Sequence, residues 1–239
     1  MSKKSRKKYY IHEGLRCAMT LTFISGYVNA FTFMTQGRRF AGVQSGNVVS
    51  FAMSLAEGNI SRALDFLLPI IVFMLGQSFT YFMHRWANKH NIHWYFFSSF
   101  ILTLIAAVTA VLTPLLPAFF TVSGLAFFAS IQVDTFKSLR GAGYANVMMT
   151  GNVKNAAYQL TKGIYEGNKE LILIGRNTLF VIISFIIGAS VSTTLSLEIG
   201  EVALIPVLFP LFYVNYLLGK EFNRIQSKIK PFQTVYSAE

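Results

Sequence analysis

Two short polar motifs recur in a largely apolar sequence and are the first candidates for chemistry. Residues 44–47 read QSGN and residues 149–152 read MTGN, so each motif places a hydroxyl residue, a glycine and an asparagine in succession. Ser, Thr and Asn side chains cap helix starts, and glycine allows another backbone to approach closely. We therefore expect each motif to begin a short helix, whose N-terminus suits an anion or a carbonyl oxygen.

An amide and a carboxylate accompany the two motifs. Asn29 and Asp134 each lie 16 residues before the hydroxyl residue of their motif. Ionisable residues inside a membrane are candidates for function, so Asp134 is a candidate carrier of a proton or cation. Alternatively it is solvated near Lys137. Arg176 either pairs with Asp134 or extends to the surface. The candidate substrate-binding residues are Asn29, Ser45, Gly46, Asn47, Asp134, Thr150, Gly151 and Asn152.

Other kinds of site lack the residues that they need. His90 and His93 are spaced to share a helix face, but no cysteine or carboxylate cluster completes a zinc site. We expect these two, His12 and His84 to be solvated loop histidines. The sequence contains no P-loop, no dinucleotide-binding glycine motif and no Ser/His/Asp motif. It therefore predicts no catalytic residues, no metal, no cofactor and no enzyme activity.

The composition places the motifs in a membrane. Of the 239 residues, 53% are hydrophobic and 13% are charged, whereas soluble domains carry about 25% charged residues. Several uncharged runs approach or exceed the roughly 20 residues that cross a bilayer, and the prolines of TPLLP (113–117) divide the longest run. We predict an all-α, polytopic integral membrane protein. Its six transmembrane helices are expected at residues 14–35, 61–86, 93–116, 117–139, 169–194 and 202–219.

The charge of +11 follows the expected topology. If the six helices cross alternately, 17 of the 21 lysines and arginines fall on one side. This bias predicts a cell-membrane protein with cytoplasmic basic tails at residues 1–13 and 220–239. Because topology accounts for the basic charge, we expect the protein to interact with the lipid bilayer and not with nucleic acid. The sequence does not define the oligomeric state. Arg38 and Arg39, on the other side, either attract an anionic solute or are solvated loop residues.

The second half of the chain repeats the first. Residues 23–55 match residues 128–160 without a gap, with nine of 33 positions identical, and residues 70–78 match residues 182–190. The second match pairs two Gly-x-Ser motifs, and small residues of this kind let membrane helices pack closely. The residues expected at such contacts are Gly76, Ser78, Gly188 and Ser190.

The repeat suggests an inverted arrangement. The repeats, residues 14–116 and 117–219, each hold three spans and a short helix, at 46–57 and 151–165, that we interpret as re-entrant. Three spans is an odd number, so the second repeat enters the membrane from the opposite side, a common plan of secondary transporters. If both short helices crossed, the repeats would be parallel, but two lysines in the second argue against that.

The quoted motifs resemble a known family. GYVNAFTF, FAGVQSGNVVSFAMSL, ASIQVDTF and YANVMMTGNVKNAAYQL are similar to the YoaK family, bacterial membrane proteins built around a domain of unknown function. The resemblance covers about residues 15–218 and implies a six-span inner-membrane protein without an established substrate. The chain departs from the family pattern at Asn29, where Asp is frequent, and at Ser45, where Thr is usual. Of the two matched residues Asn29 and Asp134, only Asp134 is therefore acidic.

Two functions follow from these patterns. The first is a secondary transporter or permease for a small polar or anionic solute, bound at the repeat interface. The alternative is a non-transporting membrane scaffold or partner-binding protein, in which the SGN and TGN motifs only cap and pack helices.

Overall fold

The computed structural model describes the backbone of residues 9–236 and the side chains of residues 9–227. The predictions made for residues 1–8 and 237–239, the outer parts of the basic tails, lie outside the described residues. The elements in chain order are η1 (Ile11–Glu13), α1 (Leu15–Thr35), α2 (Gln44–Ala56), α3 (Ile60–Lys89), α4 (Trp94–Leu112), α5 (Ala118–Thr135), β1 (Ser138–Leu139), β2 (Ala142–Gly143), α6 (Met149–Tyr165), α7 (Lys169–Ile199), η2 (Gly200–Val207) and α8 (Leu208–Tyr236).

The chain is an all-α membrane protein. Within the described residues, five helical stretches are long and apolar enough to cross a bilayer. Four of them are α1, α3, α4 and α5. The fifth runs over 59 residues, Lys169–Ser227, and contains α7, η2 and most of α8. The last predicted helix, residues 202–219, is wrong in its bounds, because Pro206 falls in a 3-10 segment and α8 begins only at Leu208.

Local sequence explains where the helices begin and end. As the prolines predict, α4 ends at Leu112 and α5 starts directly after Pro117. The tripeptide Glu-Gly-Asn precedes both α3 and α7, at residues 57–59 and 166–168. In both turns the glycine has a positive φ, and the asparagine side chain accepts hydrogen bonds from the first turn of the helix. The two halves thus start their long third helices in the same way.

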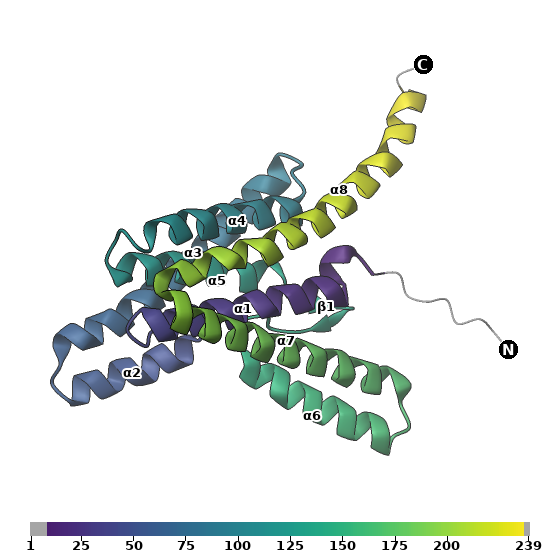
Figure 1. Cartoon of the computed structure of the whole chain (residues 1–239). Helices are drawn as coiled ribbons and strands as arrows, with labels where there is room; N and C mark the ends of the chain where they lie inside the picture. The colour runs from purple at the N-terminus through teal and green to yellow at the C-terminus, as the bar shows by residue number, and fades with distance from the viewer. Residues whose placement is uncertain (1–8, 237–239) are drawn as a thin grey trace.

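The short helices differ slightly from the prediction. Instead of residues 46–57 and 151–165, they span Gln44–Ala56 and Met149–Tyr165. Figure 1 shows that α2 folds back on the start of α3, and α6 folds back on the start of α7. Between α5 and α6 lies a two-stranded antiparallel hairpin, β1–β2, which the sequence patterns did not predict. Both short helices therefore belong to helical hairpins.

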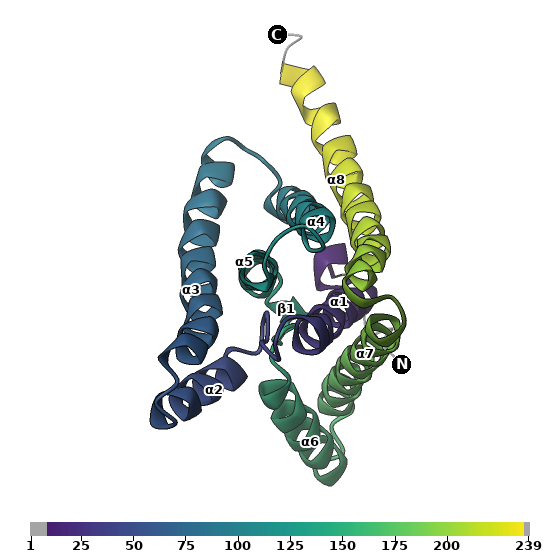
Figure 2. The same ribbon diagram turned by 60° about the vertical axis from the view of Figure 1, so that its left-hand side comes forward.

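Two long helix pairs hold the halves together. α1 packs along α7, and α3 packs along α5 (Figure 2). By the sequence repeat α1 corresponds to α5, and α7 corresponds to α3. Each pair therefore joins one helix of the first half to one of the second, and the two pairs are related to each other.

Glycines set the distance between the helices of each pair. A Cβ atom on Gly188 of α7 would lie 2.1 Å from the Phe23 carbonyl oxygen of α1, and one on Gly26 would lie 2.1 Å from the Phe185 oxygen. A Cβ atom on Gly76 of α3 would lie 2.7 Å from the Ser130 hydroxyl of α5. The helices of each pair therefore lie so close together that a side chain larger than hydrogen would not fit at these three positions.

The serines of the two Gly-x-Ser motifs do not share these contacts. Ser78 and Ser190 are exposed, so their predicted role in helix packing is wrong. The reason is helical geometry, because residues two positions apart point to different faces of a helix.

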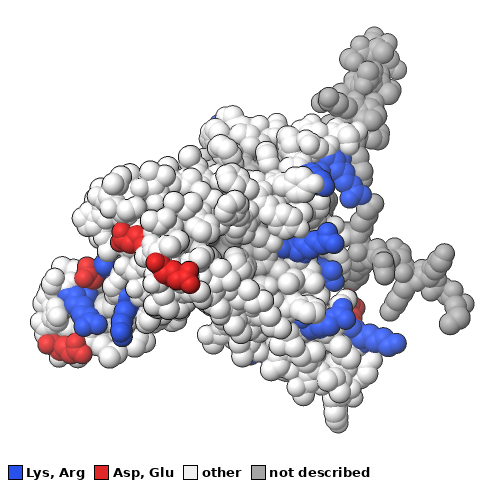
Figure 3. Space-filling view, in the orientation of Figure 1, with Lys and Arg blue, Asp and Glu red and all other residues white. Residues whose placement is uncertain are grey.

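Charged residues gather at two ends of the molecule. Figure 3 shows Lys and Arg at the end near the N-terminus, a mixed group of acidic and basic residues at the opposite end, and a wide uncharged band between them. Such a band is the surface that a bilayer requires along its hydrocarbon core.

The glycine contacts predict an asymmetric response to added methyl groups. Gly188→Ala should destabilise the protein by about 1–3 kcal/mol, because the new Cβ meets a backbone oxygen that has no room to move. Gly151→Ala in α6 is the matched control, since its Cβ would meet no atom within 4 Å. Thermal unfolding in detergent measures both. Equal unfolding midpoints for the two variants would contradict the close α1–α7 contact.

Candidate functional site

Two irregular segments meet at the centre of the molecule. They precede α2 and α6, and we call residues 40–43 and 145–148 together the loop crossing. A Cβ atom on Gly42 would lie 2.2 Å from Val147 Cγ1 and 3.2 Å from the Ala129 Cβ atom of α5. Figures 1 and 2 both show that α2 and α6 begin near one another here and then run apart. The crossing thus brings the two polar motifs together.

The motif asparagines perform the same task in both halves. Asn47 Oδ1 accepts a hydrogen bond from Phe40 N at 2.9 Å, and its Nδ2 donates to Phe40 O at 2.7 Å. Asn152 Oδ1 accepts from Ala145 N at 3.3 Å, and its Nδ2 donates to Ala145 O at 2.6 Å. Both side chains are fully buried. Each amide is therefore occupied by the backbone of the residue seven positions earlier.

The hydroxyl residues of the motifs do not cap the helices. Val43 and Met148 are the N-cap residues of α2 and α6, and neither cap has a side-chain hydrogen bond. Ser45 and Thr150 are the second residues of their helices and are exposed. The capping prediction is wrong because the asparagine amides fix the preceding loop, so each helix begins two residues earlier than expected.

Asn29 supports the first segment of the crossing. Its Oδ1 accepts hydrogen bonds from Gly42 N at 2.8 Å and Val43 N at 3.1 Å, and its Nδ2 donates to Ser25 O at 2.8 Å. This buried side chain thus satisfies two donors of irregular backbone. The glycine at position 42 is required, because any side chain there would overlap Val147.

Asp134 does not repeat the role of Asn29. Its carboxylate forms an ion pair with Lys137, and its side chain is 28% exposed. Of the partners considered for Asp134, Lys137 and Arg176, the structure shows the contact with Lys137. No ion pair with Arg176 is formed within the described residues, and Arg176 is exposed on α7. The second segment of the crossing is held instead by Asn146, whose Nδ2 donates to Phe136 O at 2.8 Å and Gln132 O at 3.2 Å.

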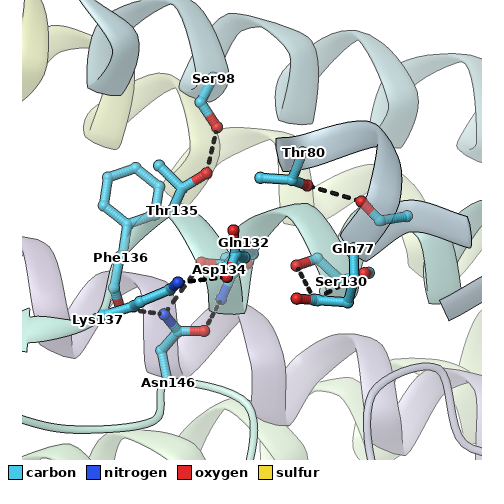
Figure 4. Close-up of polar contacts among 11 residues, drawn as sticks. Gln77, Thr80, Ser98, Ser130, Gln132, Asp134, Thr135, Phe136, Lys137 and Asn146 are labelled. Carbon is cyan, nitrogen blue, oxygen red and sulfur yellow. Dashed lines mark hydrogen bonds and ion pairs between the residues drawn. The ribbon is translucent and has the colours of Figure 1, made fainter. Parts of the chain in front are cut away.

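Polar side chains on α5 connect it to three other helices, and Figure 4 shows the contacts with α3 and α4. Ser130 Oγ donates to Phe73 O of α3 at 2.7 Å, and Thr135 hydrogen-bonds Ser98 of α4 at 2.8 Å. Gln132 Nε2 lies within hydrogen-bond distance of Leu21 O and Ser25 Oγ of α1 and of Asn146 Oδ1 in the crossing. Gln132 Oε1 is buried and has no partner in the described protein. The sequence analysis missed Gln132, although an amide in a 44-residue uncharged run was a usable signal.

A cavity of about 190 Å³ lies at the end of α5 where the basic residues gather. His12, His84, Asp134 and Lys137 contribute to its walls. His12 is not a solvated loop histidine as predicted. Its Nδ1 lies 3.1 Å from the buried Glu221 carboxylate of α8, and its ring stacks on Tyr95 at a centroid distance of 3.6 Å. The described residues contain no group of three or more potential metal ligands.

The other predicted charges also find partners. Arg39 is 8% exposed, and its Nη1 donates to Asp65 Oδ1 at 3.2 Å, while its Nε donates to Gln36 O at 2.8 Å. The prediction of a solvated loop residue is therefore wrong for Arg39. Arg38 beside it is exposed.

Comparison with known proteins identifies the family. The model of a protein family of unknown function (DUF1275) matches residues 17–217. The chain belongs to this family, which is the YoaK family. No curated protein and no solved structure matches the chain. The YoaK match runs from the first turn of α1 into the first part of α8, so both segments of the loop crossing lie inside the family domain.

The two motif asparagines should be important for stability. Asn47→Ala or Asn152→Ala leaves a buried N–H and C=O of the crossing unpaired, so each should cost about 1–3 kcal/mol of unfolding free energy. Asn155→Ala is the matched control, because Asn155 is exposed on α6. Chemical denaturation in detergent measures the difference. An Asn155→Ala variant as unstable as the other two would contradict the assigned role.

Proposed function

We propose that this YoaK-family protein is a secondary transporter or permease, not an enzyme, for a small polar or anionic solute that binds at the loop crossing. The observation that carries the proposal is the crossing itself. Asn29 and Ala129, which touch it, each lie six residues before the end of their helix, or about 9 Å along the axis. Irregular backbone so far inside membrane helices is tolerated where it is buried in protein or lines a watered cavity.

The repeated contacts support two inverted repeats. The paired asparagines, the Glu-Gly-Asn turns and the glycine contacts occur at related positions of both halves. α2 and α6 start at the crossing and point away from each other. In the proposed topology α7 and α8 cross separately, so the chain has six spans, and α2 and α6 are re-entrant from opposite sides. Discontinuous helices at a repeat interface are where transporters of this plan bind their substrates.

The charge distribution supports an orientation in the cell membrane. The basic end of Figure 3 would face the cytoplasm, with both termini on that side. The mixed end, with Arg39 and Asp65, would face outward.

The groups available to a solute differ from the original candidates. The amides of Asn47, Asn152 and Asn29 are occupied by backbone, whereas Ser45, Thr150 and Gly151 are exposed beside the crossing. Their hydroxyl and N–H groups lie in the first turns of α2 and α6, where the helix dipoles favour a negative charge. The unpaired Gln132 Oε1 adds a buried acceptor near the same place. We propose these hydroxyl and backbone groups as the solute contacts, positioned by the asparagines.

Transport measurements test this site. Purified protein in phosphatidylcholine liposomes is assayed on a solid-supported membrane with acetate, lactate, glutamate and glycine as probes. Ser45→Ala and Thr150→Val remove one hydroxyl each without touching the asparagine bonds, so each should reduce flux about threefold to tenfold at unchanged stability. Ser78→Ala, which removes an exposed hydroxyl on α3, should keep the full flux. Normal flux in the first two variants would exclude the proposed contacts.

One observation favours the alternative function. Because the motif asparagines are occupied by backbone, the motifs also fit a membrane scaffold or partner-binding protein in which they only build the crossing. Folded protein that moves none of the probes, with variants of Asn47 losing stability alone, would support this alternative.

A further inference from the structure

A second cavity, of about 320 Å³, lies between the β1–β2 hairpin and the first turns of α7. Arg140 and Tyr144 contribute from the hairpin side, and Glu170 and Asn177 contribute from α7. Leu173 and Ile174 supply apolar walls. Its volume falls at the lower end of the range of small-molecule sites, which combine apolar walls with a few placed polar groups.

The first half of the chain has an ion pair in the related part of the repeat. The ungapped repeat matches Arg39 with Tyr144, 105 residues apart. If the register of the 70–78 and 182–190 match is carried back along the continuous helices α3 and α7, Asp65 lies level with Asn177. In the first half the Arg39 guanidinium lies buried and donates to Asp65 and to Gln36 O. In the second half both charges are replaced by neutral residues. The residues at these positions in the second half, Tyr144 and Asn177, both contribute to the cavity walls.

The replacements leave polar atoms without partners. Asn177 is 3% exposed, and its Oδ1 has no hydrogen-bond partner in the described protein. The Tyr144 hydroxyl is likewise buried and makes no hydrogen bond of normal geometry, although the Asn146 amide lies near it. Burial raises the pKa of Tyr144, so its hydroxyl keeps its proton. Native proteins pair nearly all such groups, and the exceptions call for an explanation. A ligand with N–H donors would satisfy the Asn177 acceptor.

The hairpin holds a cation beside the cavity in an unfavourable conformation. Arg140 has φ 51°, followed by Gly141 with φ 80°, and a non-glycine residue in this region is uncommon. The Arg140 N–H donates to Glu13 O at 2.9 Å, which fixes the hairpin tip against η1. Positive φ at both residues is the geometry of a two-residue hairpin turn. An arginine on one wall and a glutamate on the other give the cavity both signs of charge.

We propose that this cavity binds a small zwitterion that carries an amino or guanidino group and a carboxylate or phosphate. The amino or guanidino N–H groups donate to Asn177 Oδ1, and the anionic group pairs with Arg140. A free amino acid and the headgroup of an aminophospholipid share this chemistry. The site is separate from the loop crossing and does not depend on transport.

Binding measurements on the purified full-length protein distinguish the two sources. One arm titrates L-arginine and L-serine into protein in lipid-free detergent, with the unfolding temperature and the dissociation constant as readouts. The other compares nanodiscs of phosphatidylcholine alone with nanodiscs that contain phosphatidylethanolamine or phosphatidylserine. Stabilisation by a free amino acid or by an aminophospholipid supports the proposal and names the source. Stabilisation by neither overturns it, whether or not the protein transports the probes.

Two substitutions locate the site. Arg140→Gly removes the guanidinium and relieves the positive φ, so the protein should fold while affinity falls about tenfold or more. Arg38→Gly is the matched control, because Arg38 is also an arginine with a positive φ, 59°, but lies between α1 and α2 and does not line the cavity. Asn177→Leu removes the unpaired acceptor, and it should raise the unfolding temperature of the ligand-free protein while abolishing stabilisation by ligand. Equal loss of affinity in Arg140→Gly and Arg38→Gly would overturn the assignment.

Discussion

The structure depends on satisfying irregular backbone at the centre of an apolar helix bundle. Residues 40–43 and 145–148 cross among the long helices, and each N–H or C=O group that is buried there without a partner would be costly. The chain meets this constraint with amide side chains, because Asn and Gln each carry both donors and an acceptor. Asn47 and Asn152 close their own loops, while Asn29 and Asn146 hold the two segments against α1 and α5.

The arrangement of the helices follows from that crossing. Since both loops turn back into the bundle, α2 and α6 must begin inside it and run outward in opposite directions. α3 and α7 then start at opposite ends and return past the crossing, where Gly76 and Gly188 let them lie against α5 and α1. Small residues at these contacts make room for the crossing without opening a gap around it.

Much of the fold could be predicted from the sequence, and less of the site. Apolar runs and prolines placed α1, α3, α4, α5 and α7 to within five residues, because length and hydropathy directly reflect the bilayer. They misplaced both ends of α8, which runs from Leu208 to Tyr236 instead of over residues 202–219. The repeat correctly singled out Asn47 and Asn152, but the pattern contains no information on where their amides point. Capping by Ser45 and Thr150 was a reasonable expectation from local propensity, yet the tertiary contact with Phe40 and Ala145 decided where the helices begin. Gln132 and the partners of His12 depend on residues over 100 positions away in the sequence.

The two ends of the molecule differ at the positions where the second half of the chain does not repeat the residues of the first half. Asn29 supports its loop, but the aligned Asp134 turns to Lys137, and Asn146 takes over the support from within the loop itself. This exchange accompanies the early end of α5, since α1 continues to Thr35 whereas α5 stops at Thr135 and gives way to the hairpin. The same change moves Arg140 to the hairpin tip and leaves Tyr144 and Asn177 where the first half has an ion pair. A duplicated architecture would by itself have two equivalent ends. In this chain one half has the Arg39–Asp65 ion pair, and the other has a cavity that is lined by Asn177 with its unpaired amide oxygen. Because of this difference, the two ends of a duplicated fold carry different polar groups.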